Sequence, residues 1–197
     1  MLESLLPILL SLCLQHPQWN CEIEAMRAAH LKNYVIAPTL LKLAEYDERM
    51  NSESANILMM GIAAQESDLW YNLVQLGGGP ALGGNGIEPA THADTWRYLN
   101  RSDKWALREI VLGLVPDEAV TIDSDGNYSV DDNQLIGNMP YNTAIARIRL
   151  WYVPESLPPP DDIEAIGGYY KRFYNSSGGA GTVDGFVKKY NRLVADK

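Results

Sequence analysis

The sequence predicts a predominantly helical α+β domain with one small β-hairpin, and a plain α-helical bundle is the alternative. Apolar residues recur with helical spacing through most of the chain. One Asp-Gly pair, at Asp125-Gly126, lies between two short β-prone runs. With 197 residues, of which 46% are hydrophobic, the chain is long enough and apolar enough to bury a core of its own.

The helices are expected between proline, glycine and capping signals. Residues 22–48 have a helical pattern that Pro38 should interrupt. Asn51 or Ser52 caps the next helix, which continues to Ser67 and is followed by a glycine-rich loop at 77–86. The later helical patterns cover residues 91–99, 103–114, 141–153, 163–174 and 183–194, with a stiff proline-rich linker at 154–162.

Residues 119–131 are interpreted as the hairpin, although the same residues also resemble part of a calcium-binding loop. That loop would use Asp123, Asp125, Asn127 and Ser129. Tyr128 stands where its glycine is expected, and Gln134 stands where its glutamate is expected. These two departures favour the hairpin.

The first residues, "MLESLLPILLSLCL", are strongly apolar. They do not form a convincing signal peptide, because Glu3 precedes the apolar run and no basic residue does. The run is also too short to span a bilayer, which makes membrane contact an unlikely role. We therefore expect residues 1–24 to be an apolar docking segment and residues 25–194 to form the domain. Cys13 and Cys21 are interpreted as free thiols.

The formal net charge of −9 excludes nucleic acid as an expected partner, because phosphate binding is driven by clustered lysine and arginine. The sequence gives no reason to expect a metal ion or an organic cofactor.

Glu66 is an unusual residue at the end of an apolar helix. Leu58, Ile62 and Glu66 are spaced by four and share one helical face. If the two apolar residues face the core, Glu66 lies at its margin, where loss of hydration raises the pKa of a carboxyl group. Such a carboxyl group suits general acid catalysis near neutral pH. The plainer reading is that Glu66 marks the polar end of the helix.

Four motifs occur in an order that resembles the lytic transglycosylase and goose-type lysozyme superfamily, and most of all the lysozyme-like proteins of tailed-phage virions. They are "AAQES", "GPALGGNGIEPATH", "MPYNTAIARIRL" and "FYNSSGGAGTVDGFVKKY". The order and spacing of the resemblance hold from about residue 25 to 194. The resemblance implies a lysozyme-like domain that binds peptidoglycan glycan strands and cleaves the β-1,4 bond between N-acetylmuramic acid and N-acetylglucosamine. It also implies a virion protein, in the tail or inside the particle, that acts at the bacterial cell wall and contacts other virion proteins through its apolar N-terminus.

By this resemblance Glu66 is the catalytic residue, and the motifs supply the substrate-binding residues: Ser67, Gly83, Asn85, Gly86, Ile87, Asn142, Tyr174 and Asn175. One departure concerns the loop, where the family has "LMQ" and this chain has Gly84-Asn85-Gly86. The glutamine that contacts sugar in the family is therefore missing. Asn85 could supply an amide instead, and the change Gly86→Gln would be expected to raise turnover.

A lytic transglycosylase needs no second carboxylate, whereas a hydrolysing lysozyme does. Glu88 and Asp94 are the candidates for that second group. His92, in the same turn, is interpreted as a capping or surface residue. The alternative function is a structural virion protein that has kept the fold and lost the groove. A sugar-binding module without catalysis is a third possibility.

Overall fold

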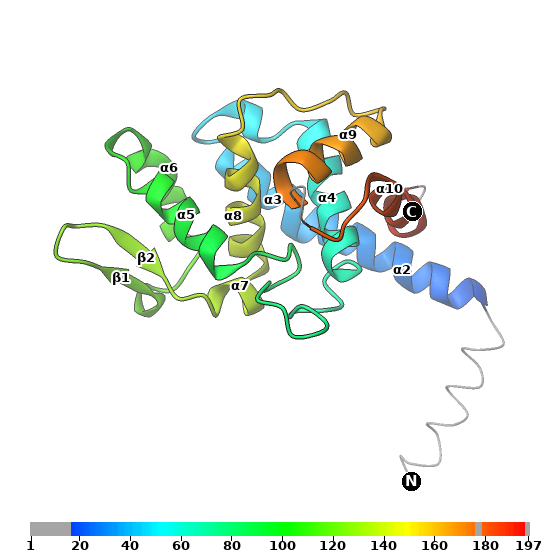
Figure 1. Ribbon diagram of the computed structural model, residues 1–197, viewed down its shortest axis with the longest axis horizontal. Coiled ribbons are helices and arrows are strands. Elements are labelled where there is room, and N and C mark those ends of the chain that lie inside the picture. The colour runs from blue at the N-terminus through cyan, green and yellow to red at the C-terminus, as the bar shows by residue number, and fades with distance from the viewer. Residues whose placement is uncertain (1–16, 176–178, 196–197) are drawn as a thin grey trace, which may run out of the picture.

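The computed structural model describes residues 17–175 and 179–195. Residues 1–16 of the expected docking segment, and the side chains of Cys13 and Cys21, lie outside the described part. The described chain is mostly helical with one small antiparallel sheet, which confirms the α+β prediction. The helix α2 (Pro17–Leu31) extends from the body in Figure 1 and passes without a break through the expected segment boundary at residue 24.

The first helical segment is widened before Pro38 rather than broken at it. The helix α2 continues into a π-helical turn, η1 (Lys32–Ile36), and then into α3 (Ala37–Leu43). Proline has no N–H and its ring crowds the preceding turn, so the wider turn gives the backbone room to continue. The backbone N–H of Ala37 accordingly donates to the carbonyl of Lys32. The predicted interruption is therefore a change of helix type.

The helix α4 (Glu53–Ser67) runs through the core and places Glu66 at its end. The Ser52 side chain caps its start by accepting a hydrogen bond from the N–H of Ala55 at 3.1 Å. Nine of its residues are buried, so the helix is held by packing on several sides.

Two C-terminal helices pack against α4 through small residues. The ring of Phe186, on α10 (Val183–Leu193), lies against Gly61 of α4 and Gly167 of α9 (Ile163–Tyr170). A side chain at Gly61 would overlap that ring, so the close packing of the three helices depends on its absence. The chain then continues from α9 into a second π-helical turn, η5 (Lys171–Asn175).

The hairpin forms one end of the molecule, at the left of Figure 1. It follows α5 (Pro89–Leu99), a 3-10 turn at Ser102–Lys104, α6 (Trp105–Leu112) and a second 3-10 turn at Asp117–Ala119. Strand β1 (Val120–Ile122) pairs with β2 (Tyr128–Val130) in the register Val120↔Val130, Thr121↔Ser129 and Ile122↔Tyr128. The predicted hairpin is confirmed. The carboxylate of Asp123 is used within its turn, where it accepts hydrogen bonds from the N–H groups of Asp125 and Asn127 at 2.9 Å.

A short helix, α7 (Gln134–Gly137), leads into α8 (Met139–Trp151), which crosses the centre of Figure 1. The helix α8 is buried from Tyr141 to Ile148. Arg147 is 2% exposed, and its guanidinium donates to the carbonyls of Met50 and Arg49 in the 3-10 turn η2 (Glu48–Met50). Burial lowers the pKa of Arg147 to about 10, but the group stays charged at neutral pH.

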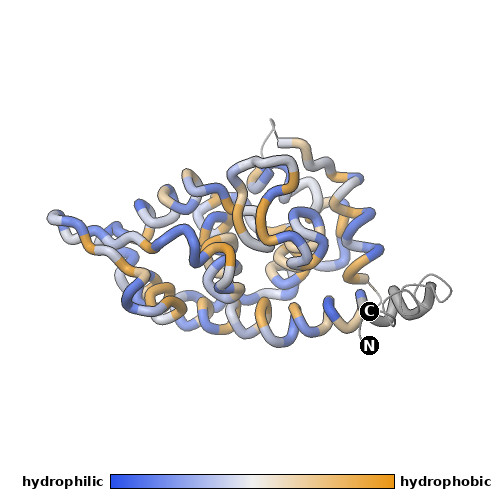
Figure 2. Tube along the Cα trace, turned by 90° about the horizontal axis from the view of Figure 1, so that it is seen from below, coloured by the Kyte–Doolittle hydropathy of each residue, from blue (hydrophilic) through white to orange (hydrophobic). Residues whose placement is uncertain are grey.

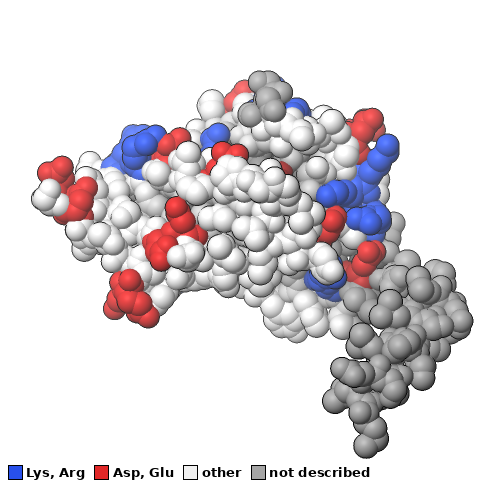
Figure 3. All heavy atoms as spheres, turned by 60° about the horizontal axis from the view of Figure 1, so that its bottom comes forward, with Lys and Arg blue, Asp and Glu red and all other residues white. Residues whose placement is uncertain are grey.

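The surface is mixed in character. Hydrophilic and hydrophobic residues alternate along the helices, as helices with one buried face require (Figure 2). On the face shown in Figure 3, the basic side chains form small separate groups that lie beside acidic ones. Within the described part of the chain, no helix combines the length and the apolar character that crossing a membrane requires.

Candidate functional site

A groove with a volume of about 560 Å³ runs past the end of α4. Its walls come from five places that are distant in the sequence: the end of α4, the segment between Asn72 and Thr91, Arg149 of α8, residues within 170–175 and 179–181, and Lys189 of α10. Glu66 is one of the lining residues. The predicted catalytic residue therefore lies in the wall of a groove large enough for a small ligand or part of a polymer.

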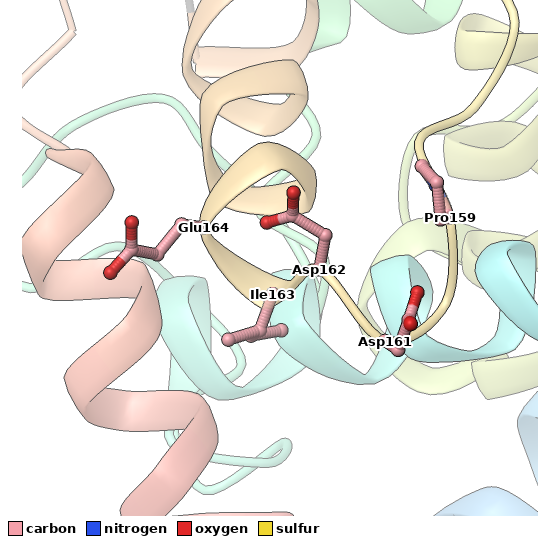
Figure 4. A pocket seen from close by; sticks show the side chains of 5 residues that line it. All are labelled: Pro159, Asp161, Asp162, Ile163 and Glu164. Atoms are coloured by element: carbon pink, nitrogen blue, oxygen red, sulfur yellow. The ribbon is translucent and has the colours of Figure 1, made fainter.

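A second hollow lies at the start of α9 and is lined by Pro159, Asp161, Asp162, Ile163 and Glu164 (Figure 4). Its three carboxylates do not converge on one point in that view. The Asp162 carboxylate instead caps α9 by accepting a hydrogen bond from the N–H of Ala165 at 2.8 Å. This hollow is explained by the start of the helix, and the groove at Glu66 is the better candidate site.

The Glu66 carboxyl group is held from one side by Tyr170. The Tyr170 hydroxyl donates to Glu66 Oε1 at 2.6 Å. Burial raises the pKa of Tyr170, so its hydroxyl keeps its proton at neutral pH. The second oxygen, Glu66 Oε2, faces Gly86, which also lines the groove.

The environment raises the pKa of Glu66 above its ordinary value. Burial is the main cause, because the charged carboxylate loses hydration. The hydrogen bond from Tyr170 and the positive charge of Lys189 act in the opposite direction and do not overcome it. Glu66 is therefore suited to hold a proton at a higher pH than an exposed glutamate does, as a general acid must.

Gly86 lies against Glu66 with a left-handed backbone. Its φ is +63°, and a Cβ atom added to it would lie 3.0 Å from Glu66 Oε2 and 3.2 Å from Glu66 Cβ. A non-glycine residue at such a φ is strained, and any side chain here would press on the carboxyl group. This geometry argues against the expectation that Gly86→Gln would raise turnover, because the substitution would strain the backbone and press on the group that it was meant to assist.

The loop of Gly83 to Gly86 is held to the body by three hydrogen-bonding side chains. Ser67 Oγ lies 2.7 Å from the carbonyl of Gly84 and accepts from the N–H of Trp70 at 2.8 Å. Asn142 Oδ1 accepts from the backbone N–H of Asn85 at 3.2 Å and from its side-chain amide at 2.8 Å. The Tyr174 hydroxyl donates to the carbonyl of Asn85 at 2.7 Å. These motif residues thus fix the loop beside Glu66.

The structure corrects the roles expected for Asn85 and Asn142. Both side chains are completely buried and face each other beneath the loop. Asn142 also donates to the carbonyls of Leu82 and Leu135 at 3.2 and 3.0 Å. Neither amide reaches the groove, so neither side chain can contact a ligand there, and Asn85 does not replace the missing glutamine.

The other predicted substrate-binding residues differ in their access to the groove. Gly83, Ile87, Tyr174 and Asn175 line it together with Gly86, whereas Ser67 is 1% exposed and lies beneath the loop. Asn175 accepts a hydrogen bond from Lys171 Nζ at 2.9 Å. The groove wall therefore combines glycine and apolar residues with two tyrosines and several polar or charged side chains, of which Glu66 is one.

The chain leaves α4 through a strained turn. Asp68, Leu69 and Trp70 have φ values of +51°, +58° and +64°, and none of them is glycine. A left-handed residue with a side chain costs roughly 1–2 kcal/mol. The turn is held by hydrogen bonds from the N–H of Leu69 to the carbonyl of Ala63, and from Trp70 to Ser67 Oγ. Strain of this kind is concentrated at functional sites, and here it begins two residues after Glu66.

Of the two candidates for a second carboxylate, only Glu88 lies in the groove. Asp94 is exposed on α5, pairs with Arg97 and is absent from the lining, so the structure rules it out as a partner of Glu66. Asp68, which the sequence did not single out, also lines the groove and forms ion pairs with Lys189 and Arg192.

His92 is a buried residue and not the capping or surface histidine that the sequence suggested. It is 2% exposed, its Nδ1 lies 2.6 Å from Asp132 Oδ1, and its Nε2 lies 2.5 Å from the Tyr141 hydroxyl. Burial lowers the pKa of His92, although Asp132 acts in the opposite direction. The histidine is therefore a neutral hydrogen-bonding group that connects α5 to the segment after the hairpin and to α8.

No group of three or more histidine, cysteine, aspartate or glutamate side chains that could hold a metal ion is found among the residues that the structure describes. Comparisons of the chain with protein-family models, with curated proteins and with solved structures give no match.

Proposed function

We propose that the chain is a lysozyme-like enzyme of the lytic transglycosylase type, which cleaves peptidoglycan between N-acetylmuramic acid and N-acetylglucosamine. The observation that supports this most strongly is the setting of Glu66. It is a groove-lining carboxyl group with a raised pKa, fixed by Tyr170 on one side and bordered by a bare glycine on the other. A proton donor beside an open groove is the one group that glycosidic cleavage of this type requires.

In the proposed reaction, Glu66 gives its proton to the glycosidic oxygen as the bond from that oxygen to C1 of the muramyl sugar breaks. The muramyl 6-hydroxyl then bonds to C1, and its proton passes to the Glu66 carboxylate. The product carries a 1,6-anhydro ring, and the enzyme regains its starting protonation state. The hydrogen bond from Tyr170 stabilises the intermediate carboxylate, and general acid–base catalysis of this kind contributes a factor of about 10² to 10⁴.

The transglycosylase reaction is preferred over hydrolysis because the described groove offers few second carboxylates. Asp68 is paired with two basic side chains, and Asp94 lies outside the groove. Glu88 is exposed and remains the only candidate for activating water. A reaction that closes a ring within the sugar needs no such group.

The order of the elements also supports the proposal of a lysozyme-like domain. A buried helix ends one residue after the glutamate, a glycine loop follows beside it, and a later helix brings Asn142 beneath that loop. The four motifs that resemble lysozyme-like proteins of tailed-phage virions thus lie together around one groove. We place the protein in such a virion, in the tail or the interior, where it would open the cell wall.

One observation favours a structural virion protein as the second candidate. The position that carries glutamine in the family is Gly86, where the left-handed backbone and the close contact with Glu66 disfavour any side chain. An enzyme that lost this amide would position glycan strands less well. On this alternative the fold and the groove remain while turnover is weak or absent.

A zymogram on purified peptidoglycan tests the proposed function. Wild type should give a cleared band, and Glu66→Gln, which keeps the shape and loses the transferable proton, should give none. Asp94→Asn is the matched control, because it removes an exposed carboxylate outside the groove and should clear the gel like wild type. No clearing by wild type would favour the structural alternative.

A further inference from the structure

A lysine, Lys189, lies close to Glu66 but binds other acceptors. Lys189 of α10 lines the groove beside Glu66. Its ammonium donates to the backbone carbonyl of Gln65 at 2.8 Å and lies 3.3 Å from Asp68 Oδ1. These two acceptors stand on either side of Glu66 in the sequence, at the C-terminal end of α4, where a positive charge is favourable.

The Asp68 carboxylate is fixed in this position by several contacts. Asp68 is the left-handed residue that ends α4, and its backbone carbonyl accepts from Arg27 Nη1 at 3.1 Å. Its Oδ1 also lies 3.2 Å from Arg192 Nη2. Two basic side chains, Lys189 and Arg192, thus share the Asp68 carboxylate, and the Lys189 ammonium is bound by Asp68 and by the carbonyl of Gln65 rather than by Glu66.

We propose that Asp68 is a positioning residue for the reaction: it binds the Lys189 ammonium and thereby prevents that lysine from forming an ion pair with the Glu66 carboxylate. The inference rests on the proposed role of Glu66 as proton donor. A lysine has a flexible stem and three donors, so it can turn to a neighbouring carboxylate when its own partner is removed. An ion pair with Lys189 would keep Glu66 ionised and unable to donate a proton.

Among the groups that face Glu66, Lys189 is the main positive charge that could keep its carboxylate ionised. Tyr170 and Tyr174, on α9 and η5, have raised pKa values and remain neutral. The loop at Gly86 presents only backbone. On α10, Lys189 affects Glu66 directly, and Arg192 reaches it only through Asp68.

Two further charged residues line the groove. Arg149 lies on the α8 wall and Glu88 on the loop wall, and neither forms an ion pair or a hydrogen bond with Glu66 in the described structure. Both remain in place in the variants below, so their influence on Glu66 is the same in every comparison.

The test is a pH titration of Glu66 in wild type, Asp68→Asn, Lys189→Met and the double variant. The titration is monitored by carbon NMR of the side-chain carboxyl groups. The Glu66 signal is identified as the one that Glu66→Gln removes. Asp68→Asn should lower the midpoint of the Glu66 titration by about one pH unit, since an opposite charge within contact lowers a carboxyl pKa by roughly 1–3. In the Lys189→Met background the same change at Asp68 should have a much smaller effect.

Two results would overturn the proposal. One is an unchanged Glu66 midpoint in Asp68→Asn. The other is an equal shift with and without Lys189, which would show that Asp68 acts through its own charge. Arg192→Met is the matched control, because it removes the other partner of Asp68 and should leave the midpoint as in wild type. Circular dichroism of each variant shows whether it is folded.

The titration needs no enzymatic activity, so it decides the role of Asp68 even if the zymogram fails. If wild type cleaves peptidoglycan, the alkaline limb of its pH–rate profile should fall at lower pH in Asp68→Asn and return toward the wild-type position in the double variant. An alkaline limb that stays unchanged while the Glu66 midpoint moves would contradict the link between Asp68 and catalysis.

Discussion

Replacing Gly86 by alanine should lower both stability and activity, for two separable reasons. At φ +63° a side chain costs roughly 1–2 kcal/mol, and this part of the effect concerns only the backbone. The added Cβ would also lie 3.0 Å from Glu66 Oε2, so the carboxyl group must shift by a few tenths of an ångström. A misplacement of about 1 Å can cost a factor of 10², which makes a loss on the order of tenfold reasonable for this smaller shift.

Gly126→Ala separates the two effects. Gly126 has a φ of +80° at the tip of the hairpin, and an added Cβ meets nothing within 4 Å. Chemical denaturation should show a similar loss of unfolding free energy for both variants, while the rate of peptidoglycan cleavage should fall only for Gly86→Ala. Wild-type activity in Gly86→Ala, or an equal loss of activity in Gly126→Ala, would show that contact with Glu66 is not the cause.

Three further substitutions test the site and its supports. Ser67→Ala removes the hydroxyl that lies 2.7 Å from the carbonyl of Gly84 and should cost about 1–3 kcal/mol of unfolding free energy in urea, where a loss below about 0.5 kcal/mol would contradict its role. Tyr170→Phe removes the donor to Glu66 and should raise the Glu66 pKa further, so the alkaline limb of the pH–rate profile should move upward; a downward move would refute this. The folded-state pKa of His92 lies below its unfolded value of 6.5, so its contribution to stability is complete above that pH and falls as the pH drops toward the folded value. Thermal unfolding of His92→Gln should therefore depend less on pH in this window than wild type, and an equal dependence would count against a buried neutral histidine.

Much of the fold could be predicted because its signals are local. Ser52 and Thr182 are capping residues whose side chains accept hydrogen bonds from the third residue beyond them, and Asp125-Gly126 gives the hairpin turn. Such signals depend on neighbouring residues alone. The π-helical turn before Pro38 could not be foreseen in the same way, because a proline is compatible with either a break or a widened turn.

The candidate site was predicted less completely, because its contacts depend on packing between distant segments. Tyr170 is 104 residues from Glu66 in the sequence, and it reaches the carboxyl group because Phe186 packs closely on Gly61 and Gly167. Its position one helical turn before Tyr174 was the available sign that both tyrosines share a face.

The direction of a polar side chain was a second source of error. The motif placed Asn85 and Asn142 in the right region, but a sequence does not say whether an amide faces a groove or lies beneath a loop. Both prove to be completely buried, where their hydrogen bonds fix the loop backbone. The same holds for His92, whose burial follows from contacts with Asp132 and Tyr141, 40 and 49 residues away.

The most direct test of Glu66 as the proton donor of a transglycosylase is mass spectrometry of the products after digestion of purified peptidoglycan. If Glu66 is that donor, wild type should give fragments with 1,6-anhydromuramyl ends and Glu66→Gln should give no fragments. Fragments with reducing ends that disappear in Glu88→Gln would instead indicate hydrolysis with Glu88 as the second carboxylate. Equal products, or equal absence of products, from wild type and Glu66→Gln would show that Glu66 is not the proton donor of a transglycosylase.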